Sequence, residues 1–218
     1  MKNGSDPSPP RPPSGQEIRA EATRTQILDA AEKLFAKRGF AGTSMRTLAE
    51  GAGTSQALLH HHFGTKAGLY EAVKLRFNDR YVAEQGEGSI ERGLDPEAVL
   101  EEVRRYFRFL QENPNLSRLV AWAWLEGDEA PWGGWEIIWG QLRRWLDHAK
   151  TEGLLAPHID PGLFMVMGAA SVQYWFDHRE VLCRTIGLDP NDPEIDDRYL
   201  AHTVGVLLTG VAARPGAD

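Results

Sequence analysis

Apolar residues recur at steps of three and four along most of the chain, with polar residues between them. This spacing places the apolar side chains on one face of an α-helix, and no segment shows the alternation that is typical of a half-buried strand. Glycines and prolines interrupt the pattern and mark the breaks between helices. It predicts an all-α protein with helices over about 20–38 (from Gln16 at the earliest), 44–51, 55–62, 65–81, 95–112, 116–127, 132–153, 161–182 and 195–212.

The sequence divides into four parts. Residues 1–18 hold five prolines among small polar residues, and they have little apolar surface to bury, so they are predicted to form a flexible arm. The short helices that follow predict a small three-helix domain over 19–65. A connecting helix, 66–84, joins it to a larger helical domain over 85–214.

The net charge of −7 conceals a difference between these parts. Residues 19–81 contain ten basic and six acidic side chains, whereas residues 82–218 contain twelve basic and 23 acidic ones. A polyanionic partner would therefore be bound by the first unit. Uneven charge also arises by chance, so this feature alone leaves the partner open.

The composition also indicates the cellular compartment of the protein. The one cysteine, Cys183, cannot form an internal disulfide, which fits a reducing compartment. No apolar run reaches the roughly 18 residues that a membrane span requires. We therefore expect a soluble, cytoplasmic protein that does not engage a membrane.

Residues 43–63 have the length and punctuation of a helix-turn-helix. Ala49 is small enough to let two short helices approach, and Gly53 can adopt the left-handed conformation that a sharp turn requires. Helical hairpins in ordinary proteins share these features. The pattern is therefore moderately specific by itself.

The wider run from Thr25 to Val73 resembles the DNA-binding domain of the TetR (tetracycline repressor) family. The resemblance is carried by ILDAAEKLFAKRGFAGTSMRTLAEGAGTSQALLHHHFGTKAGLYEAV, in which the order and spacing of the helix ends, the turn and the Phe63 to Lys66 step agree with the family. It covers about 50 of the 218 residues. Two positions depart from the family's pattern, Thr54 in place of valine and His60 in place of tyrosine.

The resemblance implies an N-terminal helix-turn-helix DNA-binding domain with a double-stranded DNA operator as its partner. Carried over position by position, it places Thr43, Ser44, Arg46 and Lys66 at the DNA backbone, where the N-terminus of the second helix adds attraction for phosphate. The residues expected to face the major groove are Thr54, Ser55, Gln56, Ala57 and His61, and His60 is expected at a phosphate. Gln56 could bond a base edge at two points.

Three consecutive histidines, His60 to His62, suggest a metal site at first sight. Neighbouring positions on a helix point about 100° apart, so one ion cannot easily collect all three. We predict no metal here, and expect His62 to pack beside Phe63. A metal-sensing site built from Glu126, Asp128 and a histidine such as His178 or His202 remains an alternative.

All seven tryptophans lie beyond residue 82. Aromatic residues at helical spacing usually form core, but several that converge could line an apolar pocket for a small molecule. We therefore predict a ligand-binding domain whose effector would contact Phe107, Trp122, Trp124, Trp135, Trp139, Phe164 and Trp175.

The last two helices predict a homodimer. Small residues at 168–171 allow close helix approach, and the final helix carries a broad apolar stripe. Both could instead complete the core of one chain, but the resemblance also implies pairing through the last two helices. The predicted dimer contacts are Gly168, Ala169, Leu200, Thr203, Leu207 and Val211.

No motif for catalysis, nucleotides or zinc hydrolysis occurs, so we predict no enzyme, no catalytic residue and no cofactor. The expected function is a repressor that leaves a palindromic operator when a small molecule binds its larger domain. A constitutive DNA-binding dimer without an effector is the first alternative, and it would have a fully packed larger domain. Activation instead of repression also remains open.

Overall fold

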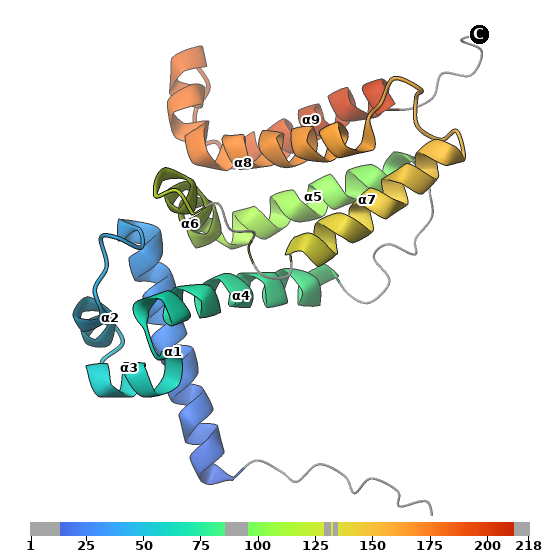
Figure 1. The fold of residues 1–218 in the computed structure, drawn as a ribbon. Coiled ribbons are helices and arrows are strands. Elements are labelled where there is room, and N and C mark those ends of the chain that lie inside the picture. The colour runs from blue at the N-terminus through green and yellow to red at the C-terminus, as the bar shows by residue number, and fades with distance from the viewer. Residues whose placement is uncertain (1–13, 86–95, 129–131, 133–134, 212–218) are drawn as a thin grey trace, which may run out of the picture.

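The computed structural model describes residues 14–85, 96–128, 132 and 135–211. The described chain is helical and contains no β-strand, which confirms the predicted all-α class. In Figure 1, α1 to α3 form a small unit, α4 leaves it, and α5 to α9 form a larger assembly. The helices are α1 (Gly15–Arg38), α2 (Met45–Gly51), α3 (Gln56–Phe63), α4 (Lys66–Gln85), α5 (Pro96–Glu112), α6 (Pro114–Leu125), α7 (Trp135–Thr151), α8 (Pro161–Ile186) and α9 (Ile195–Val211).

Helix α1 begins earlier than the predicted boundary between arm and domain. Ser14 accepts a hydrogen bond from the Glu17 N–H, and the Glu17 carboxylate accepts one from the Ser14 N–H. This reciprocal capping box satisfies two backbone donors at the helix start. Residues 15–18, predicted as part of the arm, are therefore the first turn of α1, and residues 1–13 lie outside the described part.

The helix-turn-helix forms because each of its two helices has its own cap. Ser44 accepts from the Thr47 N–H at the start of α2, and Ser55 accepts from the Leu58 N–H at the start of α3. Gly53 has φ +61° in the turn between them, the conformation predicted for it. Leu48 of α2 and Leu59 of α3 are buried in the core; α2 packs against α1, and α3 packs against α2 and α4.

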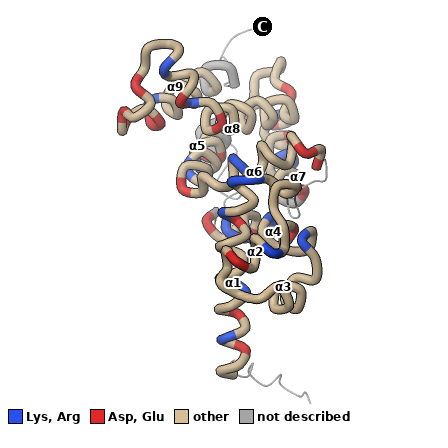
Figure 2. The backbone as a smooth tube through the Cα atoms, turned by 90° about the vertical axis from the view of Figure 1, so that its left-hand side faces the viewer, with Lys and Arg blue, Asp and Glu red and all other residues tan. Residues whose placement is uncertain are grey.

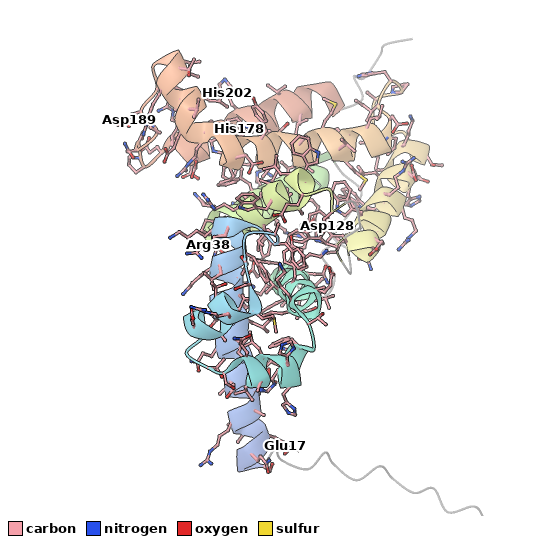
Figure 3. The ribbon with its side chains drawn as sticks, turned by 60° about the vertical axis from the view of Figure 1, so that its left-hand side comes forward. Glu17, Arg38, Asp128, His178, Asp189 and His202 are labelled. Carbon is pink, nitrogen blue, oxygen red and sulfur yellow. The ribbon has the colours of Figure 1, made fainter. Side chains whose placement is uncertain are left out.

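The small unit is tied to the larger domain by the end of α6. The Glu126 carboxylate accepts hydrogen bonds from the backbone N–H groups of Phe40 (2.9 Å) and Ala41 (3.0 Å) in the loop after α1. Asp128 accepts one from the ammonium of Lys74 on α4, at 3.0 Å. Figure 3 shows Asp128 at this junction, below α5. One short segment therefore holds both the loop before α2 and the connecting helix.

Gly39 lies beside the Trp122 ring and the Glu126 carboxylate at this junction, and it cannot be replaced without strain. Its φ is +71° and its ψ 178°, a region that is almost exclusive to glycine, and an added Cβ would meet the Trp122 ring at 2.8 Å and the Glu126 carboxylate. We expect Gly39→Ala to lower the free energy of unfolding by about 3 kcal/mol or more. Urea unfolding of the purified variant measures this.

Gly64→Ala is the matched control for that substitution. Gly64 also has a positive φ, +70°, but nothing lies within 4 Å of an added Cβ. Only backbone strain of about 1–3 kcal/mol is expected there. If both variants lose the same free energy of unfolding, steric contact with α6 does not contribute to the loss in Gly39→Ala.

Candidate DNA-binding surface and effector pocket

Helix α3 presents an uncharged surface to solvent. Ser55, Gln56, Ala57 and His61 are exposed, and Thr54 is half-buried. Figure 2 shows no lysine, arginine, aspartate or glutamate along α3. The Gln56 amide can donate and accept at a base edge, and the Ala57 methyl can meet a thymine methyl.

The histidines of α3 point to separate partners. The Nδ1 atom of His60 lies 2.6 Å from the Gly64 carbonyl oxygen, so in the tautomer that donates there Nδ1 carries the proton. His61 is exposed, and the half-buried His62 ring lies 6.1 Å from that of Phe63, as predicted. No cluster of three or more metal-ligating side chains occurs within the described residues.

Two residues predicted at the DNA backbone have other roles. Thr43 is buried and its hydroxyl donates to the Gly39 carbonyl at 2.8 Å. The Lys66 ammonium donates to the carbonyls of Phe40 and Thr43, both at 2.9 Å, and lies over the Phe40 ring. In this structure both side chains hold the loop that leads into α2, and the phosphate roles predicted for them stay predictions.

The other two backbone candidates are accessible. Ser44 and Arg46 are exposed at the first turn of α2, and Arg46 forms a salt bridge of 2.9 Å with the exposed Glu50. Exposed pairs of this kind are weak, so the guanidinium can exchange Glu50 for a phosphate at little cost.

The larger domain contains a mainly apolar cavity that offers about 100 Å³ of space. Helices α4 to α8 contribute to its wall. The lining residues are Phe77, Tyr81, Glu102, Val103, Tyr106, Phe109, Leu116, Trp135, Ile138, Trp139, Leu142, Leu146, Phe164, Met165, Gly168 and Ala169. The domain is therefore not fully packed, contrary to what a constitutive dimer without an effector would have.

Three of the seven predicted ligand contacts line this cavity, namely Trp135, Trp139 and Phe164. The other four lie outside this cavity, and Trp122 and Trp124 line a second hollow between α5, α6 and α8. Phe107 packs on Phe176 and Tyr199 in the core, Trp175 stacks on Tyr199 and donates to Asp196, Trp122 lies against Gly39, and Trp124 is 80% exposed.

The polar groups of the cavity wall were not predicted from the sequence. Tyr81 on α4 and Tyr106 on α5 have ring centroids 6.3 Å apart, and Glu102 lies one turn before Tyr106. Burial raises the pKa of both phenols above the ordinary value, and the Glu102 carboxylate raises that of Tyr81 further. Both hydroxyls therefore stay protonated. Their positions at helical spacing had indicated only core.

The predicted dimer contacts mostly face inward. Leu200 and Leu207 are only 8% and 9% exposed in the single chain, Gly168 is buried, and Ala169 lines the cavity. Thr203 is half-buried, and the side chain of Val211 lies outside the described residues. These four positions contribute little exposed surface in the single chain, and their role at a dimer interface stays a prediction.

A different face of α8 is apolar and exposed. We name it the outer α8 face, and it consists of Leu163, Val166, Met167, Tyr174 and Val181, all more than half exposed. Their spacing places them along one side of the helix. Among the described residues no helix is long and apolar enough to cross a membrane.

The metal-sensing alternative loses its ligands in this fold. Glu126 and Asp128 are engaged with the loop after α1 and with Lys74. Figure 3 places His178 and His202 on α8 and α9, away from Asp128 at the junction. The predicted set of carboxylates and histidine is therefore not brought together.

A helix-turn-helix joined to a larger helical domain is the architecture of a DNA-binding transcription regulator. Residues 27–73 match the family model described as bacterial regulatory proteins, tetR family. Over these residues the chain is similar to the DNA-binding domain of the TetR family of transcription regulators. Regulators of this family bind operator DNA and act as dimers.

Similarity to known regulators extends beyond the helix-turn-helix. The transcriptional regulator RutR of Escherichia coli is 28% identical over 210 residues, which cover 92% of this chain and 96% of RutR. The transcriptional repressor KstR2 of Rhodococcus jostii is 34% identical over 90 residues, and this match spans only 44% of that protein.

Solved structures share the fold. The ketosteroid transcriptional regulator KstR2 of Mycobacterium tuberculosis has a TM-score of 0.67 at 18% identity, with 88% of this chain and 95% of that one covered. The regulator PfmR from Thermus thermophilus has a TM-score of 0.63 at 23% identity, with coverage of 84% and 97%.

Proposed function

We propose that this protein is a cytoplasmic, homodimeric repressor that releases a palindromic operator when a small molecule enters the cavity of its larger domain. The observation that carries the proposal is the course of α4. Phe77 and Tyr81 of this helix line the cavity, while Lys66 at its other end holds the loop that leads into α2. A ligand that moves α4 would therefore also move the DNA-reading unit.

The ligand would act by binding one of two arrangements more tightly. In a dimer, the two α3 helices must be spaced to enter successive major grooves. A ligand that favours a different α4 position shifts the population toward the arrangement that does not match the operator. Repression is supported by the relative from Rhodococcus jostii, which is a repressor.

The outer α8 face supports the dimer. Its apolar residues would be covered if two copies pack α8 against α8 around a two-fold axis, which gives a self-complementary interface. Ser44, Arg46, Ser55, Gln56, Ala57, His60 and His61 would then meet DNA in each half-site.

The proposal is tested by selecting fragments of genomic DNA with the purified full chain and sequencing those retained. A palindromic consensus with two half-sites about one helical turn apart is expected. Retention of DNA without any common sequence would contradict an operator-specific repressor.

Gln56→Ala tests the base-reading role directly. We expect it to weaken binding to the selected operator by about 1 to 3 kcal/mol per half-site and to relax the preference at one symmetric position, with non-operator binding unchanged. Gln141→Ala, the same change at an exposed position of α7, is the control. Equal effects of both variants on a competition gel-shift series would remove Gln56 from the reading surface.

A further inference from the structure

Among the residues that the structure describes, none that lines the cavity carries a positive charge. No described lysine, arginine or histidine lines it, and the charged group among the described lining residues is the Glu102 carboxylate, which pairs with Arg105 at 2.8 Å on α5. A carboxylate or phosphate on a ligand would be buried beside this acid without a cation of its own in the wall. Burial of an uncompensated charge is strongly unfavourable. The wall therefore excludes anions.

One hydroxyl in the wall has an unused donor. The Tyr81 ring is held edge-on by Phe109 at 4.9 Å, and its hydroxyl makes no hydrogen bond with any residue that the structure describes. The neighbouring Tyr106 hydroxyl is already committed, because it donates to Gln173 at 3.3 Å. A phenol in an apolar enclosure is stabilised when its O–H finds an acceptor.

The space is small and bounded by flat side chains. About 100 Å³ lies below the roughly 300–1,000 Å³ of pockets that enclose drug-sized ligands. Trp135, Trp139 and Phe164 form much of the aromatic wall. Such a site fits a ligand of about the size of one substituted ring.

We propose that the cavity binds a small, uncharged, largely apolar molecule with one hydrogen-bond acceptor, such as a carbonyl oxygen, that the Tyr81 hydroxyl meets. This inference rests on the proposed function, in which the cavity is the effector site. It assigns Tyr81 as a specificity-determining residue. It also assigns the effector to the class of neutral carbonyl compounds and not to that of the corresponding acids.

Three probes of nearly one shape test the class, namely acetophenone, benzoate and isopropylbenzene. Acetophenone carries a neutral hydrogen-bond acceptor, benzoate carries an anion, and isopropylbenzene carries neither. Each is titrated into the purified full chain and followed by the NMR signals of the tryptophan indole N–H groups. We expect acetophenone to bind at least about 100-fold more tightly than benzoate. In Tyr81→Phe, the affinity of acetophenone relative to isopropylbenzene should fall about 3- to 10-fold.

Ala169→Leu provides the control, because it fills the cavity from α8 and should abolish the response to every probe. Benzoate binding as tightly as acetophenone, or an unchanged ratio in Tyr81→Phe, would overturn the ligand class while leaving the cavity as a binding site. If no probe perturbs the tryptophans of the unmodified chain, or Ala169→Leu leaves their response intact, the effector role of this cavity fails as well.

Discussion

Met167→Glu is expected to convert the protein into a monomer that no longer holds a palindromic operator. Met167 is 59% exposed in the middle of the outer α8 face, so in the proposed dimer two new carboxylates would face each other near the two-fold axis. Burying uncompensated like charges disrupts an interface. Since one α3 per chain would remain, operator affinity should fall at least about 100-fold. Sedimentation and gel-shift titrations measure the two effects.

The control for this variant is Val82→Glu, which places the same charge at an exposed valine of α4. It should remain dimeric and bind the operator normally, because Val82 is not part of the outer α8 face. A Met167→Glu protein that still sediments as a dimer at micromolar concentration would show that the chain pairs through another surface.

Asp128→Ala is expected to lower the free energy of unfolding by about 3 kcal/mol. The Lys74 side chain is 1% exposed, and its ammonium lies between the Asp128 carboxylate and that of the exposed Glu71. Removing Asp128 leaves a buried ammonium with one exposed partner. The loss is measured by urea unfolding monitored by circular dichroism.

A double variant separates this charge effect from simple loss of packing. Lys74→Met in the Asp128→Ala background removes the stranded charge and keeps an unbranched side chain, and it should recover most of the stability. The Lys74 ammonium also lies over the rings of Tyr70 and Trp132, at 5.3 and 5.7 Å, so complete recovery is not expected. A double variant no more stable than Asp128→Ala would show that the buried ammonium is not the cause.

Helical spacing predicted the helices well because the periodicity that forms a helix is local. The same spacing could not tell which neighbour covers an apolar stripe. Leu200 and Leu207 lie on an apolar side of α9 that packs within the chain, whereas Met167 and Tyr174 lie on the side of α8 that the chain leaves uncovered. Spacing alone therefore could not decide which of these two helix faces supplies the dimer contacts.

The same distinction between local and distant contacts applies to the site residues. Ser44 and Ser55 were predictable as helix caps, because a cap acts on the backbone two or three residues away. Lys66 was not predictable, since its carbonyl partners in Phe40 and Thr43 lie more than twenty positions earlier in the chain. The cavity could be located only in part, because its wall depends on how helices α4 to α8 meet.

Helix α4 determines which part of this regulator can be exchanged for the corresponding part of another regulator. Replacing α1 to α3 by the reading unit of another regulator keeps the cavity wall but requires a graft whose loop presents two N–H groups to Glu126. Moving α4 with the graft also replaces Phe77 and Tyr81, and with them part of the ligand wall. A hybrid sensor built on this chain therefore has its natural joining point between α3 and α4, where a new operator preference can be introduced without altering what the cavity recognises.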